Sequence, residues 1–292
     1  MPPFIFSSGK PVSGSKLAFE SQDSPLYVRL PGDFMHRYVF RRMTRVTTSS
    51  RRLREVLIKR VKVAPDRVSV TPFIAAEPDL FYPGIDASSL RLELGLTERD
   101  QIVLCLGEVS PYKNQLSLVR AIPDIVSRHP EARFIFAGSI LNDYRRQIDD
   151  FVRAHSLDDR VILTGFIRNY ADLPAYYNLA DIYILISRSE GNLPKTILEA
   201  MSCGRTIIAA DLPQNREGAK RGDEIIFVDP YDTTAIAAAV NRLLDDPALR
   251  QRLGENARQS ILKYHAPEVI ARGMVKVYEE VIRDNKDGKE KR

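Results

Sequence analysis

Short apolar runs alternate with longer amphipathic segments over most of the chain. Apolar runs bounded by polar loops are typical of buried strands, and segments with an apolar residue every three or four positions are typical of helices. From Gln101 onward the expected strands are 102–106, 133–137, 161–164, 182–186, 206–210 and 225–228. Strands that alternate with helices form parallel sheets covered on both faces. The sequence therefore predicts an α/β fold with a complete, Rossmann-like doubly wound sheet.

Helix start signals complete this part of the chain. Asp232 is a suitable N-cap for a helix with Ile236 and Val240 on its buried face, and Pro247 and Pro267 open two further helices. His129, His155 and His265 fall at predicted helix ends, where a cation suits the helix dipole.

The first 85 residues show a weaker form of the same alternation. Strands are expected at 26–30, 46–49 and 68–72, and helices at 34–43 and 51–60, followed by a proline-containing linker at 77–87. We therefore divide the chain into three parts. These are a partial N-terminal α/β domain with its linker (1–85), a complete domain with closing helices (86–285) and a charged tail (286–292).

The polar stretch after the strand at 182–186 carries the clearest chemical signal. It reads SRSEGNLPKTILEAMSCG and predicts a loop and then a helix, opened by Pro194 and closed by Gly204. Free backbone N–H groups and the positive end of the helix dipole favour an anion at such a helix start. Glu190 and Glu199 flank it. A ligand that carries both phosphates and hydroxyl groups would suit this stretch.

This stretch resembles the E-x7-E signature of retaining nucleotide-sugar glycosyltransferases with the GT-B fold (glycosyltransferase family 4, or glycosyl transferases group 1). The resemblance rests on Glu190-Gly191, Leu198-Glu199-Ala200-Met201 and Cys203-Gly204. It implies that Glu199 binds the nucleotide ribose and that Glu190 lies beside the transferred sugar. It also implies a donor-binding loop formed by Gly191, Asn192, Leu193 and Lys195. Eight residues separate the two glutamates here instead of seven, with the extra one in the loop.

The same resemblance implies a diphosphate site after the strand at 102–106. The family has Gly-Arg and then a Lys there, and this chain has Gly107, Glu108 and Lys113. Lys113 matches the family position. Lys113 and Glu190 are our two candidate catalytic residues. Glu108 reverses the expected charge, which in a cleft costs on the order of 1–4 kcal/mol. We therefore expect weak donor affinity or a compensating cation, either Lys195 or Arg188.

Other positions carry weaker signals. Gly165 resembles the family position that packs against the nucleobase, and a plain turn glycine is the alternative. A solvated loop lysine is the alternative for Lys113, and an exposed helix residue paired with Lys195 is the alternative for Glu199. Where the family often has a histidine after its N-terminal strand, this chain has Pro31-Gly32-Asp33, with His36 slightly beyond.

Composition narrows the class of protein. The 292 residues carry a net charge of +5, and no apolar run is long enough to span a membrane. The N-terminal MPPFIFSSGK does not resemble a signal peptide. Cys105 and Cys203 fall inside apolar patterns, so we expect buried free thiols and a cytoplasmic protein. The basic stretch 37–62 lacks interleaved aromatics, so no nucleic-acid partner is expected. We prefer the interpretation that this stretch faces a partner or solvent. The alternative is that it makes a peripheral contact with the inner face of a membrane.

These observations and the resemblance predict a retaining, hexosyltransferase-type glycosyltransferase that uses a nucleoside-diphosphate sugar. The implied acceptor is a hydroxyl of a glycan or of a lipid-linked molecule in polysaccharide or glycoconjugate synthesis. No metal or other cofactor is expected, since Lys113 and loop amides would stabilise the leaving diphosphate and no Asp-x-Asp is placed to hold a metal. The alternative is a non-catalytic or half-enzyme module that needs a partner chain for the acceptor side. A dinucleotide-dependent oxidoreductase is disfavoured because no G-x-G-x-x-G follows a strand.

Overall fold

A computed structural model of the protein describes residues 38–72 and 74–290, with side chains up to Arg283. The chain divides into two compact units, one formed by Met1–Ile74 with Glu268–Arg292 and the other by Ala75–Pro267.

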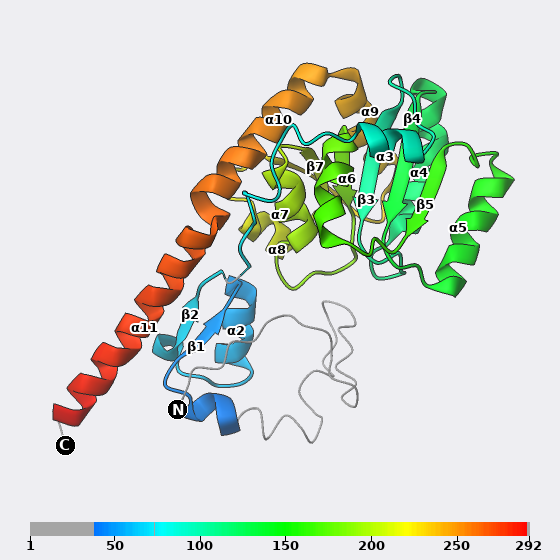
Figure 1. Cartoon of the computed structure of the whole chain (residues 1–292). Coiled ribbons are helices and arrows are strands. Elements are labelled where there is room, and N and C mark those ends of the chain that lie inside the picture. The colour runs from blue at the N-terminus through cyan, green and yellow to red at the C-terminus, as the bar shows by residue number, and fades with distance from the viewer. Residues whose placement is uncertain (1–37, 73, 291–292) are drawn as a thin grey trace. The chain divides into compact units, whose positions relative to one another are not determined.

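The larger unit is built on a parallel six-stranded sheet (Figure 1). The strand order is β5-β4-β3-β6-β7-β8. The strands are β3 (Gln101–Leu106), β4 (Ala132–Ala137), β5 (Val161–Gly165), β6 (Ile182–Leu185), β7 (Thr206–Ala210) and β8 (Ile225–Val228). All of β6 and β7 is buried, as expected for strands covered on both faces. The expected doubly wound sheet is confirmed.

Helices connect and cover these strands in two layers. On one face α4 packs against α5 and α9, and on the other α6 packs against α3 and α7. The helices are α3 (Ser88–Glu93), α4 (Gln115–Arg128), α5 (Asn142–Ala154), α6 (Leu173–Leu179), α7 (Lys195–Ser202), α8 (Pro213–Gly218), α9 (Thr233–Asp245) and α10 (Pro247–Ser260). A 3-10 turn, Tyr170–Asp172, precedes α6, and a π-helical turn, Ile261–His265, follows α10.

Two helix ends show how local sequence sets these boundaries. Asp232 caps α9 by accepting a hydrogen bond from the Ala235 N–H at 2.9 Å, and Ile236 and Val240 are buried, as predicted. Helix α7 ends at Ser202, and Gly204, two residues further on, has a φ of 65°. The N–H of Gly204 bonds to Met201, which closes the last turn.

The smaller unit contains two parallel strands joined by a helix. Strands β1 (Val46–Thr48) and β2 (Val68–Val70) pair in register, and α2 (Arg51–Lys59) lies between them in the chain. The buried side chains of this unit include Val46, Leu57, Val63 and Val68. The two described strands confirm the parallel arrangement. The expected strand at 26–30, the segment Pro31-Gly32-Asp33 and His36 lie outside the described residues.

Part of the basic stretch is tied to the backbone of this unit. The Arg41 Nε donates to the Val61 carbonyl at 3.2 Å, and the Arg54 Nε donates to the Val68 carbonyl at 3.1 Å. These arginines therefore stabilise the small unit, and whether the stretch faces solvent, a partner or a membrane stays a prediction.

The final helix differs from the sequence prediction. Helix α11 runs from Pro267 to Glu290, so residues 286–290 of the expected charged tail are helical. The segment has no proline, and Lys and Glu are good helix formers. Among the helices that the structure describes, α11 included, there is no apolar stretch long enough to cross a bilayer.

Candidate active site

The predicted site residues lie at the point where the chain changes direction across the sheet. From β3 the chain proceeds outward to β4 and β5, and then returns to β6 on the other side of β3. The loops after β3 and β6 therefore diverge at the carboxyl edge, where open α/β sheets bind their ligands. Gly107 and Lys113 come from the first loop, and Glu190 through Leu193 come from the second.

The two candidate catalytic residues form an ion pair across this point. The Lys113 Nζ lies 2.6 Å from the Glu190 Oε1, and the side chains are only 21% and 11% exposed. Lys113 is therefore not a simple solvated loop lysine. Its charge is directed at Glu190 in the structure.

Asn114, which sequence reasoning missed, fixes the position of Lys113. It has a left-handed backbone, with a φ of 61°, and precedes α4. Its Nδ2 donates to the carbonyls of Ile186 at 3.2 Å and Pro230 at 2.7 Å. These bonds tie together the loops that follow β3, β6 and β8. Asn tolerates the left-handed region better than most residues, which is the one signal that the sequence offered.

Gly138 allows the ends of β3 and β4 to approach closely. Gly138 has a φ of 144°, and a Cβ placed there would lie 2.0 Å from the Gly107 carbonyl oxygen. The N–H of Gly138 donates to Gly165 at 2.8 Å, and Gly165 has a φ of 74°. Gly107 and Gly165 thus shape one edge of the sheet, and Gly138 was not predicted. Whether Gly165 contacts a nucleobase stays a prediction.

Glu199, the expected ribose ligand, is buried. Only 2% of the residue is exposed, so the alternative of an exposed helix residue is wrong. Its Oε2 accepts a hydrogen bond from the Tyr177 hydroxyl at 2.7 Å, and its Oε1 accepts one from Tyr170 at 2.9 Å. Burial raises the pKa of this carboxyl, although both tyrosines and Lys195 oppose the shift.

Lys195 points toward a carboxylate that was not predicted to belong to the site. Its Nζ lies 2.7 Å from the Glu77 Oε1 but 3.9 Å from the Glu199 Oε1. The hydrogen bond from Lys195 lowers the pKa of Glu77. Glu77, Tyr170 and Lys195 therefore form one cluster of contacts beside the Glu199 carboxylate. The expected pairing of Lys195 with Glu199 is the weaker of its two contacts.

The loop before α7 mixes exposed and buried positions. Gly191 is exposed, Asn192 is half-buried, and the Leu193 side chain is buried against α8. A Cβ at Gly218 would lie 2.5 Å from the Leu193 Cβ, so the glycine makes room for this leucine. The Gln214 amide also donates to the Glu190 carbonyl. Leu193 could therefore meet a ligand only through its backbone. Pro194 is the N-cap of α7, and its ring has no oxygen to occupy the first-turn amides.

The charge reversal at Glu108 lies on an exposed side chain after β3. Of the two candidate compensating cations, Lys195 is paired with Glu77. The Arg188 guanidinium lies 5.8 Å from the centre of the Tyr231 ring, and its backbone N–H bonds to Tyr112. Arg188 is thus the candidate that lies beside the loop of Lys113.

The histidine prediction is partly wrong. His129 caps the carboxyl end of α4 and lies 3.4 Å from Asp245, and His155 caps α5. His265 is buried in the turn after α10, and burial lowers its pKa to about 4. It is therefore neutral at physiological pH and cannot act as a cation at a helix end.

The two cysteines agree with the sequence prediction. Cys105 and Cys203 are buried free thiols. Burial raises the pKa of both to about 12, so neither is a reactive thiolate.

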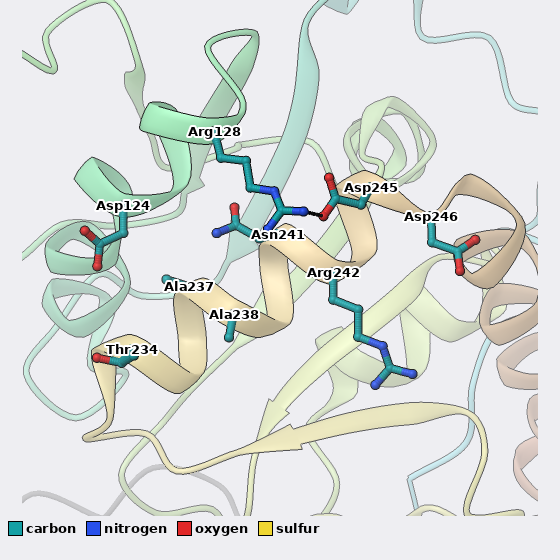
Figure 2. Close-up of a pocket in the computed structure, with 9 residues that line it drawn as sticks. All are labelled: Asp124, Arg128, Thr234, Ala237, Ala238, Asn241, Arg242, Asp245 and Asp246. Atoms are coloured by element: carbon teal, nitrogen blue, oxygen red, sulfur yellow. Dashed lines mark ion pairs between the residues drawn. The ribbon is translucent and has the colours of Figure 1, made fainter.

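A separate groove of about 540 Å³ lies along α4 and α9 (Figure 2). An ion pair between Arg128 and Asp245 spans it. The lining residues are Asp124, Arg128, Thr234, Ala237, Ala238, Asn241, Arg242, Asp245 and Asp246. No predicted site residue lines this groove, and it lies along the helices rather than at the carboxyl edge of the sheet. Within residues 38–72 and 74–290, no group of three His, Cys, Asp or Glu side chains is placed to hold a metal ion.

The family described as Glycosyl transferases group 1 matches residues 87–260. Among curated proteins, alpha-D-kanosaminyltransferase of Streptomyces kanamyceticus is 30% identical over 76% of this chain and 56% of its own length. N-acetyl-alpha-D-glucosaminyl L-malate synthase of Bacillus anthracis is 29% identical over 70% of this chain and 52% of its own length. The chain thus spans about half the length of these relatives.

Solved structures share the fold. Sucrose-phosphate synthase from Thermosynechococcus elongatus has a TM-score of 0.74 and 27% identity, covering 86% of this chain and 62% of its own. HepE of Anabaena, in complex with UDP and glucose, has a TM-score of 0.74 and 20% identity, covering 85% of this chain and 66% of its own. These likenesses confirm the expected α/β fold of the GT-B type.

Proposed function

The chain belongs to the glycosyl transferases group 1 family, and on that premise we propose that it transfers a sugar from a nucleoside-diphosphate sugar to an acceptor hydroxyl. The observation that carries this proposal is the meeting of Lys113 and Glu190 at the switch point of the sheet. The start of α7 follows directly in the chain, and the same helix carries Glu199. Groups that can bind phosphate and a carboxylate that can bind hydroxyls thereby lie close together in the chain.

The donor would lie along this segment. Its ribose hydroxyls would donate to the Glu199 carboxylate, and its diphosphate would face the first turn of α7 and Lys113. The helix dipole and the Lys113 ammonium would then stabilise the charge that develops on the leaving diphosphate. UDP in the HepE complex supports a nucleoside diphosphate as the donor's leaving group.

In the reaction, the bond between the anomeric carbon and the diphosphate oxygen breaks, and the diphosphate keeps the electron pair. The acceptor hydroxyl attacks the same face of the sugar, which retains the configuration, and its proton leaves with the diphosphate. Glu190 would lie beside the transferred hexose and hold Lys113 until the phosphates replace it. We propose a glycan or lipid-linked hydroxyl as acceptor and no metal ion, because Lys113 and the α7 dipole supply positive character at this point.

Thermal unfolding with UDP, GDP and ADP tests the donor site. A nucleotide present at 100 times its dissociation constant should add about 2.7 kcal/mol to the stability of the folded state. The expected result is a clear rise in melting temperature with one of the three, followed by slow hydrolysis of the matching nucleotide sugar without acceptor. If none of the three raises the melting temperature, the donor-site assignment is wrong.

A further inference from the structure

The Tyr170 hydroxyl is shared between two carboxylates. Its oxygen lies 2.9 Å from the Glu199 Oε1 and 3.0 Å from the Glu77 Oε1. A phenolic hydroxyl has a single hydrogen, so it can donate to only one of them at a time. Burial and the two carboxylates raise the pKa of Tyr170, so the hydroxyl keeps its hydrogen at neutral pH. The site therefore has two arrangements that differ in the direction of one hydrogen.

These arrangements are not equivalent in this structure. Glu77 has a second partner in the Lys195 ammonium at 2.7 Å, whereas Lys195 is 3.9 Å from Glu199. If the hydrogen turns to Glu77, the buried Glu199 Oε1 loses its hydrogen-bond donor, and a buried acceptor without a partner is costly. The hydrogen therefore lies toward Glu199 in this arrangement of the side chains.

The exchange needs no movement of the tyrosine ring. The rings of Phe81 and Tyr170 pack edge to face with their centres 5.5 Å apart. The Lys195 ammonium lies 4.8 Å from the centre of the Tyr170 ring. Tyr170 is 40% exposed, so a ligand can reach this side of the cluster. Tyr177, in contrast, is fully buried, and its bond to the Glu199 Oε2 stays in place.

We propose that Tyr170 competes with the donor ribose for Glu199, and that Glu77 receives the Tyr170 hydrogen when a ribose hydroxyl binds. Glu77, which lies in the segment before the first strand of the larger unit, is thereby a positioning residue of the donor site. This inference rests on the proposed function. It adds that donor affinity depends on a hydroxyl and a carboxylate that lie outside the stretch from 187 to 204.

The test compares Tyr170→Phe, Glu77→Gln and the double variant by isothermal titration. The probe is whichever of UDP, GDP and ADP stabilises the wild type most, together with its 2′,3′-dideoxy form. Removing the competing hydroxyl should tighten the nucleotide by about 3- to 10-fold, the equivalent of about one hydrogen bond. Glu77→Gln should weaken it, because a neutral amide oxygen receives the tyrosine hydrogen less well.

Two comparisons separate competition from a structural effect. The gain from Tyr170→Phe should vanish with the dideoxy nucleotide, which has no ribose hydroxyl to replace the tyrosine. The loss from Glu77→Gln should largely vanish in the Tyr170→Phe background, because the two residues act through one hydrogen. Tyr176→Phe is the matched control. It removes a hydroxyl from α6 that interacts with Thr164, and it should leave the affinity unchanged.

The outcomes distinguish this inference from the function on which it rests. If the nucleotide binds the wild type but Tyr170→Phe binds it equally or more weakly, the competition is refuted and the donor site stands. The same holds if the dideoxy form shows an equal gain. If no nucleotide binds the wild type or any variant, both the donor site and the competition are refuted.

Discussion

Glu199→Gln separates binding from stability at this site. The carboxyl group is buried, and its two oxygens accept from Tyr170 and Tyr177. Burial raises its pKa, so the charged form is penalised in the folded protein. A neutral Gln relieves that penalty but loses two charge-assisted hydrogen bonds. Because these effects oppose each other, the free energy of unfolding should change by only about 1 kcal/mol.

The effect on the ligand should be larger. A hydrogen bond from a ribose hydroxyl to a carboxylate contributes about 1.5–3 kcal/mol, which corresponds to about 10- to 150-fold in the dissociation constant. The pH dependence has a defined sign. A ribose hydroxyl that donates to Glu199, as we propose, favours the charged form of this carboxyl, so affinity in the wild type should fall as the pH drops through a pKa above the ordinary 4.5. The free energy of unfolding depends on pH in the opposite direction. Because the pKa of Glu199 is raised in the folded protein, this group contributes stability at low pH that is lost as the pH rises.

Isothermal titration with the nucleoside diphosphate that stabilises the wild type most measures the affinity, and calorimetric unfolding measures the stability. Glu255→Gln, on an exposed part of α10, is the matched control and should change neither quantity. An unchanged nucleotide affinity in Glu199→Gln would refute the reasoning. A loss of several kcal/mol of stability would show instead that the carboxylate is chiefly structural.

Three further predictions concern other parts of the larger unit. Glu190→Gln releases the Lys113 ammonium for the diphosphate, so nucleotide affinity should rise about 3- to 10-fold while transfer of the sugar falls. Equal titration curves for variant and wild type would contradict this. Gly138→Ala places a methyl group against the Gly107 carbonyl and should cost about 3 kcal/mol or prevent folding, measured by urea unfolding; wild-type stability would contradict it. His265 has a pKa of about 4, so stability should fall by up to about 3 kcal/mol as the pH drops from about 6.5 to 4. His265→Gln should flatten this fall, and an unchanged urea profile between pH 4.5 and 7 would count against the burial of a neutral ring.

The framework of the larger unit could be read from the sequence because its strands are buried on both faces. Each expected strand lies within one residue of the observed one, from 102–106 for β3 to 225–228 for β8. Local signals also set the helix ends. Asp232 caps the start of α9 and Gly204 follows the end of α7, since an N-cap side chain and a left-handed glycine act on their own neighbours.

The partners of Glu199 could not be predicted in this way. Tyr170 and Tyr177 reach it from 29 and 22 residues away, and Glu77 meets Lys195 across 118 residues. Periodicity assigns a residue to a face of its own helix but not to a distant partner. The apolar residues that surround Glu199 in the sequence were the available clue to its burial. Similarly, the match of Lys113 to a family position did not reveal that its ammonium group forms an ion pair with Glu190.

We propose above all that Glu199 and the start of α7 hold the ribose and diphosphate of an activated sugar. A crystal structure of the protein with its best-binding nucleoside diphosphate tests it most directly. We predict a ribose hydroxyl within hydrogen-bond distance of the Glu199 Oε1 and phosphate oxygens facing the first turn of α7 and the Lys113 Nζ. A nucleotide bound elsewhere, with Tyr170 still donating to an unchanged Glu199, would contradict it.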